Sequence, residues 1–268
     1  MTYVTVRMCP LERESFGASF PWGVERRSQA KPFKVESAGR TMDSDTHPPK
    51  VVVFDCDGVL VDAVSSWRTL HDAFGTDNGL NLNRFIRGEL SDVEFMRSDI
   101  QLWKAVRNPI HQDEIFRAYA GVNLMKGTRE VVQRLHDEGI YVAIVSAGVD
   151  VFVSSIAAML NVEDWIANGF VFDEEGYLSD EGICRLHASG KGEIIHRLLE
   201  MQGFEPADCV SVGDSEMDLS MHVPGSRFIG FNPTRESSVE AFEKAGVPVI
   251  TVRDLREILP LLGLSTKE

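Results

Sequence analysis

The sequence has 268 residues, is 43% hydrophobic and 25% charged, and carries a net charge of −14 with a pI of about 5.0. A surface this acidic repels nucleic acids and anionic membranes, so we expect neither as a partner. No apolar run approaches the ~20 residues that a membrane-spanning helix needs. The cysteines show no C-x-x-C pair, which fits a reduced, cytoplasmic setting. They are Cys9, Cys56, Cys184 and Cys209.

Residues 1–49 differ from the rest of the chain. They show no sustained helical or strand periodicity and lack the 7–15-residue apolar region of a signal peptide. Glu12, Glu14 and Glu25 argue against a transit peptide. We expect a disordered N-terminal extension, or residues translated from upstream of a true start at Met42.

From residue 50 onward, short apolar runs rich in β-branched residues alternate with helical patterns. Continuous apolar runs are typical of strands that are covered on both faces. Strands are expected at residues 50–54, 141–146, 209–212, 228–231 and 247–252. Helices are expected at residues 128–138, 149–160, 192–201, 237–245 and 255–262. This alternation predicts an α/β fold with a doubly wound, mostly parallel sheet, formed by residues 50–62 and 123–268.

Residues 63–122 interrupt the alternation and look all-helical. The side chains at positions 67, 70, 71 and 74 share one helical face, and Ser91 with Glu94 has the form of a capping box. We therefore predict a small helical domain inserted after the first strand. Two short β runs around residues 170–178 also suggest a hairpin beside the main sheet.

Polar side chains fall at the ends of the predicted strands. Asp55 and Asp57 follow the first strand, Ser146 ends the second, and Asp214 follows the third. Lys191 lies at the start of a predicted helix. Ligands of a parallel α/β sheet bind outside the carboxyl ends of its strands, so we expect these side chains to share one pocket.

That combination of groups indicates phosphoryl transfer. Carboxylates crowded in one pocket need compensation, and oxygen ligands without a histidine cluster favour Mg²⁺ over Zn²⁺. One carboxylate can be the nucleophile, and an acid two residues on can move a proton. Ser146 and the backbone N–H groups from Ala147 onward suit phosphate oxygens, and Lys191 would neutralise the nucleophile and the phosphate. The expected intermediate is an aspartyl-phosphate.

The segments "VVVFDCDGVLVD", "AIVSAG", "GKGE" and "VGDSEMD" resemble the four motifs of the haloacid dehalogenase (HAD) superfamily. The resemblance implies that Asp55 is the nucleophile and that Asp57 is the general acid/base and a Mg²⁺ ligand through its carbonyl. It also implies that Ser146 and Lys191 bind phosphate and that Asp214 is a metal ligand, with Asp218 supporting the metal shell.

Other segments, among them "GELSDVEFMRSDIQLW" and "VRDLREIL", resemble the phosphoserine phosphatase branch, in which residues 63–122 would be a C1 cap. The resemblance places a residue that reads the substrate ammonium at Val64 and a residue that grips its carboxylate at Asp99; neither has the branch's usual charge. A different substrate pocket is therefore expected. Its candidate residues are Trp67, Arg68, His71, Arg97 and Trp103.

These observations together predict a cytoplasmic, Mg²⁺-dependent phosphatase that acts on a small phosphorylated metabolite, as a monomer or homodimer. Asp57 supports phosphate esters as substrates, because the haloalkanoate- and phosphonate-cleaving branches lack that acid. A phosphomutase of the same superfamily is one alternative. A non-catalytic regulator is another, although such a protein is expected to have lost Asp55, Asp57, Lys191 or Asp214.

Overall fold

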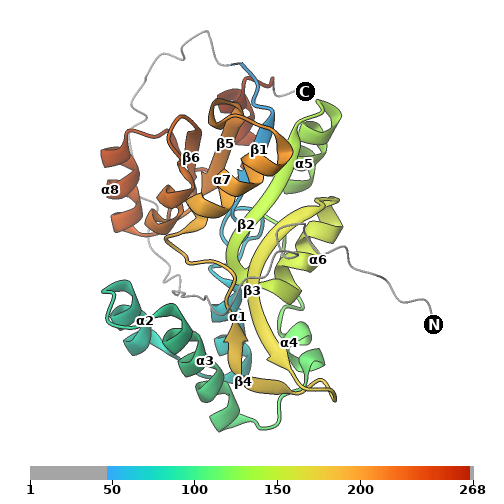
Figure 1. Cartoon of the computed structure of the whole chain (residues 1–268), viewed down its shortest axis with the longest axis vertical. Helices are drawn as coiled ribbons and strands as arrows, with labels where there is room; N and C mark the ends of the chain where they lie inside the picture. The colour runs from blue at the N-terminus through green and yellow to red at the C-terminus, as the bar shows by residue number, and fades with distance from the viewer. Residues whose placement is uncertain (1–46, 266–268) are drawn as a thin grey trace, which may run out of the picture.

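The computed structural model describes residues 47–265, so most of the predicted extension lies outside the described residues. Its centre is a seven-stranded sheet in the order β4-β3-β2-β1-β5-β6-β7 (Figure 1). The strands are β1 (Val51–Phe54), β2 (Tyr141–Val149), β3 (Asp164–Phe172), β4 (Leu178–Ile183), β5 (Cys209–Gly213), β6 (Arg227–Phe231) and β7 (Val249–Ile250). All neighbouring pairs are parallel except β3 with β4. The predicted mostly parallel α/β sheet is confirmed.

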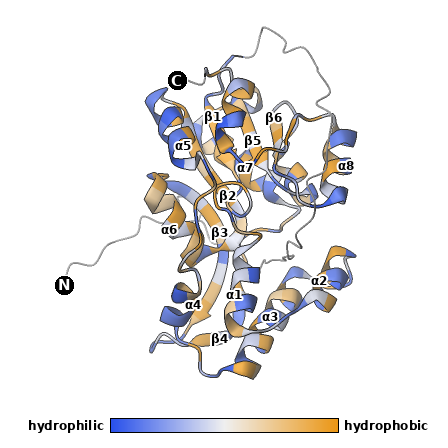
Figure 2. Cartoon of the chain, turned by 180° about the vertical axis from the view of Figure 1, so that it is seen from behind, coloured by the Kyte–Doolittle hydropathy of each residue, from blue (hydrophilic) through white to orange (hydrophobic). Residues whose placement is uncertain are grey.

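Helices cover both faces of the sheet, as expected for apolar strands that must be shielded from water on each side. The helices of this part are α5 (Thr128–Asp137), α6 (Asp150–Leu160), α7 (Lys191–Gln202) and α8 (Glu236–Ala245). Every residue of β1 is fully buried, and Figure 2 shows the apolar strands enclosed by helices with polar outer faces. Residues 255–262 form a 3₁₀ helix, η4 (Leu255–Leu262), with Pro260 inside it; two shorter 3₁₀ helices are η2 (Pro206–Asp208) and η3 (Glu216–Met221).

Four helices lie between β1 and α5 in the chain, where an all-helical segment was predicted. They are α1 (Ser66–Phe74), α2 (Gly79–Ile86), α3 (Asp92–Val106) and α4 (Gln112–Ala118). The capping box of Ser91 and Glu94 is present at the start of α3. Figure 1 places this four-helix segment in the lower half of the view, below α5, α7 and α8.

The predicted hairpin near residues 170–178 exists but is larger than expected. Its first strand, β3, is nine residues long and pairs in parallel with β2, so the hairpin belongs to the main sheet. The apolar pattern missed most of β3 because the strand starts at Asp164 and contains Asn168. Both strands of the hairpin extend towards the four-helix segment (Figure 1), where Trp67 and Trp103 pack against Phe170 of β3 at ring-centroid distances of 5.2 and 5.7 Å.

Within the described residues no helix is long and apolar enough to cross a membrane.

Candidate active site

The carboxyl end of β1 carries the two aspartates that open the site. The Asp55 N–H donates to the carbonyl of Val212 in β5 at 2.9 Å, so the end of β1 is tied to its neighbouring strand. The chain then turns through Gly58, whose φ of +78° is a left-handed conformation that favours glycine. The turn leaves Asp55 and Asp57 6% and 7% exposed. Both carboxyl groups are therefore held in an interior that strongly disfavours an isolated charge.

Lys191 supplies the opposite charge. It is the first residue of α7, where the helix dipole disfavours a cation, and yet it is 1% exposed. Gly192 lets α7 approach η3 closely, since a Cβ there would lie 2.3 Å from the Ser220 carbonyl oxygen. The ammonium Nζ lies 2.9 Å from Oδ1 of Asp55 and 2.7 Å from Oδ1 of Asp218. The sequence-predicted pairing of Lys191 with the site is thus a buried contact with two carboxylates.

Asp214 and Asp218 come from the end of β5 and from η3. Oδ2 of Asp218 accepts hydrogen bonds from the N–H groups of Asp214 and Ser215, at 3.1 and 2.9 Å, and from the Ser215 hydroxyl at 2.8 Å. One carboxylate oxygen from each of Asp55, Asp214 and Asp218 lies within 4.8 Å of the others. Three oxygen ligands grouped in this way fit the preference of Mg²⁺ for hard donors.

The charge balance also fits a cation. Burial is the largest cause of a raised pKa at Asp55; the Lys191 ammonium opposes it, while the Asp218 and Asp57 carboxylates add to it, and the pKa reaches about 7. Burial on its own would lower the pKa of Lys191, but Asp218 and Asp55 raise it above its ordinary value. The ammonium therefore stays charged, and the surrounding carboxylates still exceed it in number.

Asp57 is oriented differently from Asp55. Its Oδ2 accepts hydrogen bonds from both the N–H and the hydroxyl of Ser66, each at 2.7 Å. Its Oδ1 is buried and has no hydrogen-bond partner within residues 47–265. Burial raises the pKa of Asp57, and the two bonds from Ser66 only partly offset this. A carboxyl group with a raised pKa beside a nucleophile is suited to move a proton.

Ser146 lies inside β2 and does not end the strand as predicted, because β2 continues to Val149. The pairing of β2 with β3 shifts register between Val145 and Val149, so Ser146 and Ala147 lie in an irregular stretch. The Ser146 hydroxyl is fully buried and accepts a hydrogen bond from the Gly148 N–H at 2.9 Å. Its own proton remains available for an acceptor such as a phosphate oxygen.

Comparison with known proteins agrees with this site. The model of the haloacid dehalogenase-like hydrolases matches residues 49–222, a range that includes Asp55, Ser146, Lys191 and Asp218. The chain belongs to this family.

Among the HAD relatives, the phosphoserine phosphatase of Methanocaldococcus jannaschii is 28% identical over 213 residues, which cover 78% of this chain and 96% of that protein. The phosphoserine phosphatase of Wolinella succinogenes is 26% identical over 213 residues, covering 78% and 98%. A solved phospho-aspartyl intermediate analogue of phosphoserine phosphatase superposes with a TM-score of 0.67 at 25% identity, covering 80% of this chain and 99% of that one. The predicted HAD-type phosphatase, similar to phosphoserine phosphatases, is confirmed at the level of family and enzyme class.

In the structure, the predicted specificity residues of this HAD protein are either buried or held in ion pairs. Trp67 is fully buried in the aromatic cluster with Trp103 and Phe170. Arg68 contacts Asp72 and Asp77 at 2.7 and 2.6 Å. Arg97 contacts Glu181 of β4 at 2.8 Å. Each of these side chains has a partner within the protein, and their part in substrate recognition remains a prediction.

Asp99, at the position expected to read a substrate carboxylate, belongs to a buried polar network. It is 1% exposed, and its Oδ1 lies 2.9 Å from Nε2 of His71 and 2.6 Å from the Asn78 amide nitrogen. His71 in turn accepts from the Trp103 indole N–H at Nδ1, at 3.1 Å. Burial raises the pKa of Asp99, and His71 and Asn78 partly offset this. An acidic side chain held in this way offers no cation to a substrate carboxylate.

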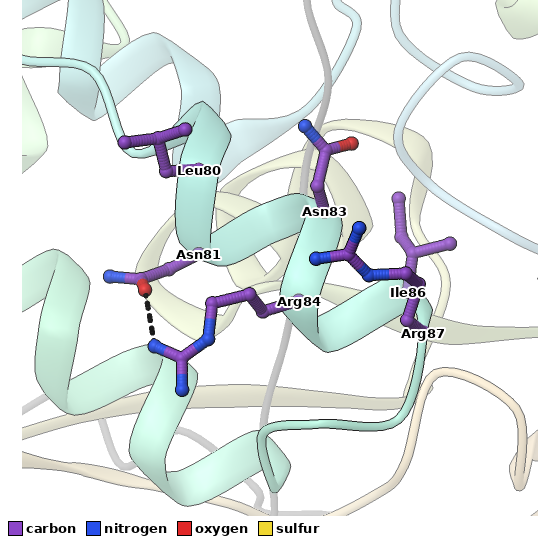
Figure 3. A pocket seen from close by; sticks show the side chains of 6 residues that line it. All are labelled: Leu80, Asn81, Asn83, Arg84, Ile86 and Arg87. Carbon is purple, nitrogen blue, oxygen red and sulfur yellow. Dashed lines mark hydrogen bonds between the residues drawn. The ribbon is translucent and has the colours of Figure 1, made fainter.

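A surface hollow of about 560 Å³ lies elsewhere, on α2 (Figure 3). Its described lining consists of side chains of α2 and of Arg87, the residue that follows it, and none of them belongs to the carboxylate cluster. They are Leu80, Asn81, Asn83, Arg84, Ile86 and Arg87. The hollow is therefore separate from the residues that carry the chemistry.

Sequence reasoning missed one contributor, Ser66, which bonds to the Asp57 carboxylate. In the sequence, Ser66 is recognisable only as the second residue of a Ser-Ser pair before an apolar helical face. The residue that caps α1 is Ser65, whose hydroxyl accepts a hydrogen bond from the Trp67 N–H at 3.2 Å. The bond from residue 66 to residue 57 depends on the turn between them, which no local pattern indicates.

Proposed function

We propose that the protein is a Mg²⁺-dependent phosphatase that hydrolyses a small phosphate monoester in the cytoplasm through an aspartyl-phosphate on Asp55. The observation that supports this best is the position of Lys191 between Asp55 and Asp218, with Asp214 adding a third carboxylate to the group. A nucleophile, a buried cation and a grouped set of oxygen ligands meet at one end of a parallel sheet, where such enzymes bind their ligands.

Each residue has a distinct role in the proposed reaction. An oxygen of Asp55 attacks phosphorus, and the bond to the leaving oxygen breaks as Asp57 donates a proton to it. Asp57 then takes a proton from the water that attacks the phospho-aspartate. Lys191 and the Ser146 hydroxyl hold phosphate oxygens, and their electrostatic support strengthens as charge builds up on the phosphoryl group.

Asp55, Asp214 and Asp218 would hold the cation, with the Asp57 carbonyl as a further ligand. Mg²⁺ held there supplies positive charge, which reduces the repulsion between an anionic nucleophile and a dianionic ester. The four-helix segment, as part of a cap spanning residues 63–122, would cover the substrate, while residues 50–62 and 123–268 form the catalytic core.

The test is a panel of phosphorylated metabolites, with phosphoserine and p-nitrophenyl phosphate included, assayed with Mg²⁺ and with EDTA. Asp55→Asn should abolish turnover and also abolish acid-stable labelling of the protein by ³²P substrate, because the attacking oxygen is lost. Asp137→Asn, on the exposed end of α5, is the matched control and should behave as wild type. Phosphatase activity retained by Asp55→Asn would overturn the nucleophile assignment.

A further inference from the structure

Ser66 joins three parts of the molecule. It is the first residue of α1, and its side chain is fully buried. Its N–H and hydroxyl both donate to Oδ2 of Asp57 at 2.7 Å, and its hydroxyl oxygen accepts from the Val149 N–H at 2.9 Å. One serine therefore connects Asp57, the four-helix segment and the end of β2, three residues beyond Ser146.

The two carboxyl oxygens of Asp57 are consequently not equivalent. Oδ2 faces two donors, so a proton on that oxygen would meet the hydrogens of Ser66. Oδ1 is buried and has no partner among the described residues. A buried oxygen without a partner is costly unless a ligand supplies one. The geometry thus assigns the transferable proton to Oδ1 and the anchoring bonds to Oδ2.

We propose that Ser66 is a positioning residue, which holds the Asp57 carboxyl so that Oδ1 faces the reacting oxygens; this rests on the proposed phosphatase function. As the bond from Asp55 to phosphorus forms and the ester bond breaks, the proton on Oδ1 moves to the leaving oxygen and gives the alcohol. As water attacks phosphorus and the Asp55–phosphorus bond breaks, Oδ1 takes one proton from that water.

The absence of a side chain at Gly148 leaves room for the contact between Ser66 and Asp57. A Cβ at Gly148 would lie 3.0 Å from the Ser66 Oγ and 3.1 Å from the Ser146 Oγ. A larger residue at position 148 would press on both hydroxyls. The backbone between Ser146 and Val149 is therefore shaped around the serine that holds Asp57.

The test separates proton delivery from folding through the leaving group. Ser66→Ala is compared with Ser65→Ala, which removes the hydroxyl that caps α1 and contacts the Trp67 N–H. For each variant, kcat/KM is measured with an alkyl phosphate that wild type hydrolyses and with p-nitrophenyl phosphate. The alkoxide needs a proton to leave, whereas nitrophenolate is stable without one.

Ser66→Ala should lower kcat/KM for the alkyl ester about tenfold or more, which is a fraction of the full effect of general-acid catalysis. For p-nitrophenyl phosphate it should lower kcat/KM by less than about threefold. It should also slow hydrolysis of the phosphoenzyme, so that a burst of nitrophenol precedes the steady state. Ser65→Ala should change both kcat/KM values by the same small factor and show no new burst. Ser66→Cys fills the same space with a slightly larger group, but its thiol is a weak donor, so it should show the same selective loss.

Equal losses on both esters, or no loss, in Ser66→Ala and Ser66→Cys would overturn the role of Ser66 while leaving the phosphatase assignment intact. A wild-type protein that hydrolyses no phosphate ester of the metabolite panel with Mg²⁺ would overturn the proposed function, and the role of Ser66 with it.

Discussion

Lys191 donates a 2.7 Å hydrogen bond to Asp218 from a position that is 1% exposed, so α7 and η3 are joined by a buried ion pair. The same ammonium lies 2.9 Å from Asp55 at the end of β1. One side chain therefore both stabilises the carboxylates and brings three separate elements of the chain to the same point.

Replacing Lys191 by methionine should lower the free energy of unfolding by about 3–5 kcal/mol, because two buried carboxylates lose their counter-ion. Urea unfolding in EDTA measures this, and added Mg²⁺ should restore part of the loss. Lys126→Met is the matched control: Lys126 is 69% exposed and pairs with Asp254, so its loss should cost less than about 1 kcal/mol. Equal effects of the two substitutions would contradict a central role for Lys191.

Asp55→Asn should make the metal-free protein more stable at alkaline pH. The pKa of Asp55 rises from 3.8 to about 7 on folding, chiefly through burial, so the folded state holds the proton more tightly than the unfolded state. That contribution to stability is complete below pH 3.8 and is lost as the pH rises through about 7. Asparagine does not ionise, and Lys191 keeps Asp218 as its partner.

The measurement is thermal unfolding in EDTA between pH 5 and pH 8. The Tm advantage of Asp55→Asn over wild type should grow with pH up to about pH 7 and then level off. Asp137→Asn should show no such trend. A variant that is less stable than wild type at pH 8 would show that the Asp55 carboxylate is compensated within the folded protein.

The parts of the fold that the sequence predicted are those set by local patterns. The apolar runs of β1 and β5 and the side-chain spacing of α5 need no distant partner to be recognised. The meeting of Asp55 with Asp214 followed from the parallel sheet, since the carboxyl ends of its strands share one edge. The general position of the site therefore follows from the sequence pattern alone.

The parts that were missed depend on partners far along the chain. Asn168 sits fully buried in β3, and it is satisfied by the Leu186 carbonyl at 3.0 Å and by the Arg185 N–H at 2.6 Å. Arg97 is held by Glu181, 84 residues away. Neither pairing changes the local sequence pattern. The pattern therefore indicates a loop at the buried Asn168 and an unpaired, substrate-binding side chain at Arg97.

Gly58→Ala should weaken Mg²⁺ binding by about tenfold or more, as expected when a ligand is displaced from its place. A Cβ at Gly58 would lie 2.5 Å from Oδ2 of Asp214, so this carboxylate would have to move. Calorimetric titration with Mg²⁺ measures the change. Gly139→Ala is the control, because Gly139 has a similar φ of +70° but nothing within 4 Å of the added carbon. It should lose stability to the same backbone strain and keep its Mg²⁺ affinity.

The last prediction concerns the substrate. A phosphoserine-specific site needs to read both an ammonium and a carboxylate, yet the positions that the family resemblance predicts for this are Val64 and the buried Asp99. Asp99 is taken up by His71 and Asn78. We therefore expect kcat/KM for phosphoserine to exceed that for phosphoethanolamine, which lacks the carboxylate, by less than about threefold. A buried charged partner for the carboxylate would be worth about 2–5 kcal/mol.

Steady-state kinetics on phosphoserine, phosphoethanolamine and phosphoglycolate distinguish the outcomes, because each of the last two lacks one of the charged groups. A preference for phosphoserine of about a hundredfold or more would require an energy of about 2.7 kcal/mol, and a cation elsewhere would then have to read the carboxylate. Arg68 could do so only by leaving Asp72 and Asp77. If that preference is found, Arg68→Met should remove it. If phosphoserine is not preferred, Arg68→Met should change kcat/KM for all three substrates by the same factor.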